Sequence, residues 1–238
     1  MINIKRTENV PSSLEIEKVK AETKNNPKSG KHNLEDVIQQ LEHDFKKKCY
    51  LCETKTTSFE VEHLKSHQGD IKLKFDWNNL FLSCRHCNNS KSTSFDNILD
   101  CTKEDVEKEI RYRIDLTYIA NVEITTTSED ERVKKIVELL EKCFNGENTP
   151  TKTLDSKNIK RKIVKEVKDF LECINDYIDA KEYDEEDEIP ELEKSIKRHL
   201  NNNSEYVSFK RCIIKYNPDL KQLFGQYIPT IEREAQYA

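Results

Sequence analysis

Apolar residues recur every three or four positions along most of the chain, a spacing that predicts amphipathic helices. One such stripe follows Asn33, a favourable residue before a helix, and consists of Leu34, Val37, Ile38, Leu41 and Phe45. Between residues 49 and 94 the spacing gives way to short mixed runs, at 58–61 and 77–82, which predict short strands or connectors. Helical spacing returns after Cys101.

The region beyond Cys101 is predicted to be mostly helical, with an acidic run at 184–188 before Pro190 as a solvated linker. A helix from Thr102 would place Val106, Ile110 and Ile114 on one face, and the capping box Ser128-x-x-Glu131 begins another. Further helices are expected over 156–178, 191–200 and 205–214. We therefore predict an α+β chain that is mostly helical, divided into an N-terminal arm (1–32), a small module (33–101) and a helical region (102–238).

Charge and hydropathy exclude several classes of protein. A chain of 238 residues with a net charge of -5 is too acidic to coat nucleic acid along its whole surface. No apolar run reaches the roughly 18 residues that cross a bilayer. The chain also turns polar directly after Met1 and Ile2, without the apolar core of a signal peptide, so we expect a cytoplasmic protein.

Four of the eight cysteines form two pairs with metal-binding spacing, Cys49 with Cys52 and Cys84 with Cys87. Two residues between ligands let a tight turn direct both sulfurs at one ion, and four thiolates suit tetrahedral zinc. One such pair alone could be a redox site, but neither lies in a thioredoxin-like pattern, and two pairs favour structural zinc. The others are most simply small buried hydrophobes: Cys101, Cys143, Cys173 and Cys212.

Between and just after these pairs stand three further features: Glu62-His63, Asn79-Leu80, and Asn88 with Lys91 directly after Cys87. Their order and spacing resemble the HNH (ββα-metal) endonuclease family over roughly residues 45 to 95. Each feature alone carries little information, whereas the set is specific. The resemblance implies a zinc-stapled ββα-metal module that hydrolyses phosphodiester bonds.

Phosphodiester hydrolysis needs a group that activates water and a cation that stabilises charge on the phosphate. A neutral imidazole can take the proton of water near neutral pH, and a divalent ion on hard oxygen ligands can act as the Lewis acid. The resemblance implies a role for each matching residue: His63 as general base, Glu62 and Asn88 as ligands of the catalytic ion, Asn79 as an orienting residue, and Lys91 as a phosphate contact.

The motif departs from the commoner family pattern at two positions. Many relatives have Asp before the histidine, where this chain has the longer Glu62, and many have His where this chain has Asn88. An amide oxygen suits Mg²⁺ or Mn²⁺ better than softer ions, so we expect one of these as the catalytic metal beside structural Zn²⁺. His67 is a further candidate for a substrate or metal contact.

Basic residues surround the motif and suit contacts with phosphates: Lys46, Lys47, Lys48, Lys65, Lys72, Lys74, Arg85 and Lys91. The resemblance implies binding to duplex DNA, which we therefore prefer as the substrate. A second basic group is either another nucleic-acid contact or a solvated helix face: Lys157, Lys160, Arg161, Lys162 and Lys165.

A narrower similarity is carried by Glu62-His63, residues 76–84 and Ile98-Leu99-Asp100, which resemble nucleases encoded beside OLD-type ATPases in Septu-type antiphage defence. It implies an OLD/ABC-type ATPase as a protein partner, docked on the region after Cys101. Two other functions stay open. One is a non-catalytic zinc-ribbon module that binds nucleic acid or protein, and the other is an HNH effector that cleaves RNA.

Overall fold

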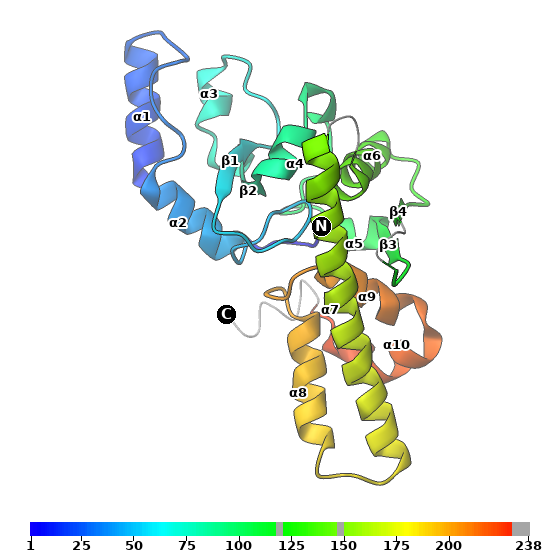
Figure 1. The fold of residues 1–238 in the computed structure, drawn as a ribbon. Helices are drawn as coiled ribbons and strands as arrows, with labels where there is room; N and C mark the ends of the chain where they lie inside the picture. Colours follow the sequence, from blue (N-terminus) through cyan, green and yellow to red (C-terminus); the bar gives the residue numbers. More distant parts are fainter. Residues whose placement is uncertain (118–120, 147–149, 230–238) are drawn as a thin grey trace. The chain divides into compact units, whose positions relative to one another are not determined.

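The computed structural model describes residues 1–117, 121–146 and 150–229 (Figure 1). It is mostly helical with two small sheets, which confirms the predicted α+β class. The chain divides into two compact units. One is made of Met1 and residues 3–110 and 126–143, the other of Ile2, residues 111–125 and the described residues from Phe144 onward. This division describes packing, and the functional division at residues 32 and 101 stays a prediction.

The first unit is built around the antiparallel pair of strands β1 and β2. Its elements are α1 (Ser12–Thr23), α2 (Glu35–Asp44), β1 (Phe59–His63), α3 (Ile71–Lys74), η1 (Trp77–Asn79), β2 (Leu80–Cys84), α4 (Arg85–Ser90), η2 (Thr93–Phe95), α5 (Val106–Glu109) and most of α6 (Glu131–Asn145). Every side chain of β2 is buried. The ring centroid of Phe81 lies 5.5 Å from that of Phe45 and 5.0 Å from that of Tyr50. These aromatic contacts form the core beneath the sheet.

The first two helices are joined to each other by a polar contact. Ser13 donates through its hydroxyl and its backbone N–H to the carboxylate of Asp36, at 2.5 and 3.2 Å. The helix predicted after Asn33 exists as α2, but it begins at Glu35. It ends at Asp44, and Lys46 and Lys47 shortly beyond it adopt a φ of 55°, a left-handed conformation that no helix continues.

The second unit consists mainly of helices. Its elements are β3 (Arg111–Ile114), β4 (Val122–Thr125), α7 (Pro150–Glu182), α8 (Ile189–Leu200), α9 (Val207–Tyr216), α10 (Pro218–Phe224) and η3 (Gly225–Tyr227). Apolar side chains of α7 and α8 form a core with α9 and α10, among them Phe170, Ile174, Ile196, Ile214 and Phe224. No helix in the described part of the chain combines the length and the apolar character that a membrane span requires.

The prediction of a helix from Thr102 onward is wrong for the second half of that segment. α5 covers only four residues, and the chain then forms β3, which pairs with β4 in antiparallel register. Alternation explains the error, because Ile110, Tyr112 and Ile114 are separated by Arg111 and Arg113, a period of two that suits a strand. Pairing buries Tyr112 with Ile124, and this tertiary contact decides between the two patterns.

Candidate active site

The hairpin and the helix after it form a ββα unit. β1 ends at His63, which is the register partner of Leu80 at the start of β2. β2 leads directly into α4, and the Cys84 sulfur accepts the backbone N–H of Cys87 in the first turn of that helix, at 3.5 Å. Side chains alternate along a strand, so Glu60 and Glu62 lie on one face of β1 and His63 lies on the other.

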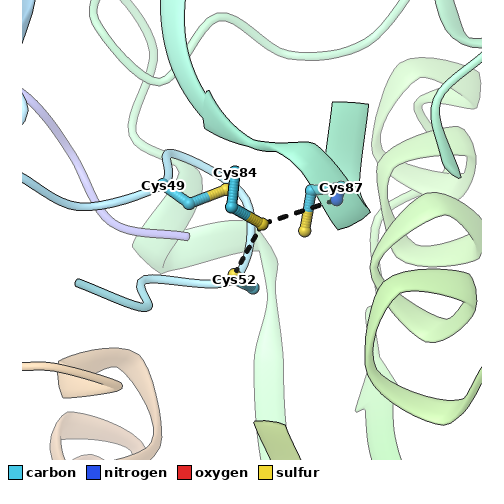
Figure 2. A group of neighbouring side chains, drawn as sticks. All are labelled: Cys49, Cys52, Cys84 and Cys87. Carbon is cyan, nitrogen blue, oxygen red and sulfur yellow. Dashed lines mark hydrogen bonds between the residues drawn. The ribbon is translucent and has the colours of Figure 1, made fainter. Parts of the chain in front are cut away.

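The four paired cysteines meet at one point (Figure 2). Cys49 and Cys52 come from the segment after α2, Cys84 ends β2, and Cys87 lies in α4. Their sulfur atoms lie within 4.8 Å of one another, and all four residues are buried. The spacing of the cysteines in the sequence therefore predicted their assembly correctly.

The dimensions and the charge of this cluster fit zinc. A Zn–S bond of about 2.3 Å in a tetrahedron separates the sulfurs by about 3.8 Å, and the sulfurs of Cys52 and Cys84 are 3.8 Å apart. Burial raises the pKa of the Cys49 thiol, but hydrogen bonds from the other three thiols outweigh it and hold that pKa well below its usual value. A divalent cation would let all four thiols ionise, so the cluster suits structural zinc.

A fifth cysteine lies beside the cluster, which the sequence did not indicate. Cys143 of α6 is buried, and its thiol forms a hydrogen bond with Cys87. In addition, the Nε2 of His86 lies 2.7 Å from the Cys143 carbonyl oxygen. Together these contacts attach α6 to the cysteine-bearing turn of α4.

The Glu62 carboxylate is buried inside the first unit and faces the ammonium group of Lys91. Its Oε1 is 3.2 Å from the Nζ of Lys91, and the same Nζ donates to the His63 carbonyl at 3.0 Å and lies 3.8 Å from Asp96. Burial raises the pKa of Glu62 to about 7, against the opposing effect of Lys91. The Oε2 of Glu62 is buried and forms no hydrogen bond of standard geometry within the described residues, although the nearby Ser83 side chain helps to lower the pKa of this carboxyl.

Asn88 lies over the same face of β1. Its Nδ2 donates a hydrogen bond to the carboxylate of Glu60, two residues before Glu62 on the strand. Its Oδ1, the atom that a hard cation would take, is not used in that bond. Glu60 is thus a second carboxylate on this face, and its i, i+2 relation to Glu62 is the sequence signal that could have indicated it.

His63 lies on the opposite face of β1 among two other histidines. Its Nε2 is 3.0 Å from the Lys74 carbonyl oxygen, and its ring centroid is 4.6 Å from that of His32 and 4.9 Å from that of His67. A carbonyl oxygen can only accept, so Nε2 carries the proton and Nδ1 of the neutral ring is free to accept one. Burial is the main cause that lowers the pKa of His63 and favours this neutral form.

Asn79 fixes the loop that follows His63. Its Oδ1 accepts from the Lys65 N–H at 2.8 Å, and its Nδ2 donates to the carbonyls of Lys65 and Leu73 at 2.8 and 3.1 Å. These bonds join the residues after β1 to α3, whose last residue, Lys74, provides the carbonyl partner of His63. This geometry is compatible with the orienting role that the resemblance implies for Asn79.

Lys74 also holds the segment that carries His32. Its ammonium is buried and donates to three backbone carbonyls, those of Pro27, Ser29 and Gly30, at 3.0, 3.0 and 2.9 Å. Gly30 has a φ of 75°, and a Cβ there would lie 2.6 Å from the Glu17 carbonyl oxygen, so the turn requires glycine. Burial and the neighbouring His63 lower the pKa of His32 to about 4.

Residues 48–94 match the family model of the HNH endonucleases. The chain therefore contains an HNH domain, and the match covers β1, β2, α4 and all four clustered cysteines. No curated protein and no solved structure matches the chain. The HNH domain supports a nuclease of that family, whereas the specific roles of Glu62, His63, Asn79, Asn88 and Lys91 remain proposals.

Replacing Lys74 by Met tests the contact that holds the segment around His32. The variant loses three charge-assisted hydrogen bonds from a buried ammonium group to half-buried residues, so we expect the free energy of unfolding to fall by about 3 kcal/mol. Chemical denaturation measures this change. The exposed neighbour Lys72 is the matched control, and its replacement by Met should change stability by less than about 0.5 kcal/mol. Equal stability of both variants would contradict the inferred contact.

Removing one sulfur tests the zinc cluster. Cys84→Ser should lower the bound zinc, measured by elemental analysis, and abolish the cooperative melting of the HNH domain, because metal binding drives folding of such modules. Cys173→Ser, a change at a buried cysteine outside the cluster, should retain the zinc. An unchanged melting curve after verified loss of zinc would show that the metal is not structural.

Proposed function

We propose that this chain is a metal-dependent endonuclease that hydrolyses the phosphodiester bonds of DNA through its HNH domain. The observation that carries the proposal is the position of His63 at the end of β1. The Nε2 of His63 donates to the Lys74 carbonyl oxygen at 3.0 Å, which leaves Nδ1 to accept a proton from water. The Glu62 carboxylate lies on the opposite face of β1, and its buried Oε2 forms no hydrogen bond of standard geometry within the described residues.

Each residue of the motif has a role in this proposal. His63 takes the proton of the attacking water, and Asn79 keeps the following loop in place. Glu62 and the Oδ1 of Asn88 would hold Mg²⁺ or Mn²⁺, which when bound supplies Lewis-acid stabilisation of the phosphate and the leaving oxygen. The Lys91 ammonium contacts Glu62 and the His63 carbonyl, so it orients the carboxylate. The phosphate contact predicted for Lys91 stays a prediction.

The choice of DNA over RNA rests on the family resemblance and on local charge. Exposed cations near the motif, such as Lys65 and Arg85, suit contacts with a phosphate backbone without reading of bases. An HNH effector that cleaves RNA and a zinc module that only binds are the competing functions. The RNA-cleaving effector differs from the proposal in its substrate, and the zinc module differs because it does not catalyse cleavage. One experiment can therefore distinguish the three functions.

A role in bacterial antiphage defence or restriction is the biological setting that we propose, in the cytoplasm and together with an OLD/ABC-type ATPase. The similarity of Glu62-His63, residues 76–84 and residues 98–100 to Septu-type nucleases supports this part of the proposal. The helical second unit offers the surface for such a partner. Co-purification of the full chain with an ATPase encoded beside it would test the association.

Replacing His63 by Ala tests catalysis. We expect cleavage of plasmid DNA with Mg²⁺ to fall by about 10²- to 10⁴-fold, because the general base is lost, while binding of DNA changes little. His43, whose side chain is 65% exposed, provides the control variant His43→Ala, which should cleave normally. Total RNA is digested in parallel. Preferential cleavage of RNA would replace DNA as the substrate, and equal cleavage by His63→Ala would exclude the proposed base.

Two adjacent asparagines test the proposed metal ligand. Asn88→Ala should raise the Mg²⁺ concentration needed for half-maximal cleavage by about tenfold or more, because one oxygen ligand is removed. Asn89, the next residue of α4, is exposed and serves as the control, and Asn89→Ala should leave that concentration unchanged. The measurement is a Mg²⁺ titration of the initial cleavage rate. Equal titration curves for the two variants would remove Asn88 from the metal site.

A further inference from the structure

The outer face of α7 changes sign along its length. From residue 157 to 168 the exposed positions are all cations except Asn158: Lys157, Arg161, Lys162, Lys165 and Lys168. From Asp169 to the end of the helix, most exposed positions are acids or carry no charge. The charges are therefore segregated, in contrast to the mixed charges of an ordinary solvated helix.

Four of these five cations also lack intramolecular partners. Within the part of the chain that the structure describes, Lys157, Arg161, Lys162 and Lys165 form no hydrogen bond or ion pair. Exposed lysines of other helices behave differently, because Lys134, Lys194 and Lys197 each lie within 3.3 Å of a glutamate. The positive charge on α7 is thus available to an external anion.

The only acid between 157 and 168 points away from this face. Glu166 accepts a hydrogen bond from the buried ammonium of Lys210 on α9, at 2.7 Å. The buried cation Lys160 likewise donates elsewhere, to the Asn121 side chain at 3.3 Å. Neither residue therefore reduces the positive charge that the exposed face presents.

The spacing of the exposed cations suits a linear array of phosphates. Lys157, Arg161 and Lys165 are four residues apart, so they share one side of the helix. At about 1.5 Å per residue they cover about 12 Å. One strand of duplex DNA carries a phosphate about every 3.4 Å along the axis, so the row matches about four phosphates.

We propose that this row of cations on α7 binds the phosphate backbone of duplex DNA as a second contact site, distinct from the HNH domain. The inference rests on the proposed function for the identity of the nucleic acid. It adds a binding surface that lies outside residues 48–94. The row contacts phosphates and reads no bases, and the acidic half of α7 repels DNA and so limits the contact to residues 157–168.

Charge-removing substitutions in the full-length chain test this site. Lys157→Gln, Arg161→Gln and Lys165→Gln are combined, because Gln is a good helix former and exposed positions tolerate it. Binding of a 30-base-pair fluorescent duplex is measured by anisotropy over a range of salt, in a His63→Ala background that prevents cleavage. We expect the dissociation constant at low salt to rise at least about tenfold and the salt slope to fall by about 3.

A matched control removes the same charge from paired lysines. Lys134→Gln, Lys194→Gln and Lys197→Gln together should leave the affinity within about twofold, since their ammonium groups are already engaged. Lys157→Arg with Lys165→Arg retains the charge and should bind as the parent does, which shows that binding depends on the charge and not on the lysine side chain itself. The proposal would be overturned by an equal loss of affinity in the paired-lysine control, or by unchanged duplex binding in the α7 Gln variant.

The result separates this inference from the proposed function. Cleavage of plasmid DNA by the otherwise unmodified chain, together with unchanged binding in the α7 variant, would overturn the second site alone. Absence of DNA cleavage that depends on His63 would overturn the proposed function, while a salt-dependent loss of duplex binding in the α7 variant would still support the site. Tighter binding to RNA than to the duplex, lost in the same variant, would overturn the assignment to DNA.

Discussion

Convergence of four buried sulfurs is the constraint on which the first unit depends. The chain from Cys49 to Cys52 is tied to the end of β2, since the backbone N–H of Tyr50 donates to the Leu82 carbonyl at 3.0 Å and the cysteine sulfurs gather beside it. A hairpin of two five-residue strands is marginal by itself. Zinc bound by the cluster would anchor one end of that hairpin and hold its register, which places Glu62 and His63 on opposite faces of β1.

Local chemistry explains why the cysteine cluster could be predicted. Zinc ligands occur at short, chemically constrained spacings, so the two cysteine pairs were sufficient to predict their assembly, whereas the ββα unit was implied by the resemblance to the HNH family. Longer helices were predicted equally well from apolar spacing, as α6 and α7 show. The failure at residues 111–114 occurred where the same residues satisfy two periods, and there a tertiary contact with β4 decides.

Contacts distant in sequence could not be predicted. Lys74 is one lysine among many in the sequence, and its three carbonyl partners become visible only when the segment at 27–30 folds back over α3. That contact brings the ring centroid of His32 to 4.6 Å from that of His63, although 31 positions separate the two residues. Burial at both positions then favours neutral imidazoles, a property that composition does not reveal.

Pairing within the chain, and not net charge, determines where an acidic protein can bind an anionic polymer. With a net charge of -5, long-range attraction to DNA is weak, so binding must depend on cations that no internal carboxylate neutralises. On α6 and α8 the exposed lysines are neutralised by glutamates one turn away. On α7 between residues 157 and 168 the one acid is turned inward to Lys210, and the positive charge stays on the surface. A chain that is acidic overall can therefore bind phosphates at a few defined places without adhering to nucleic acid elsewhere.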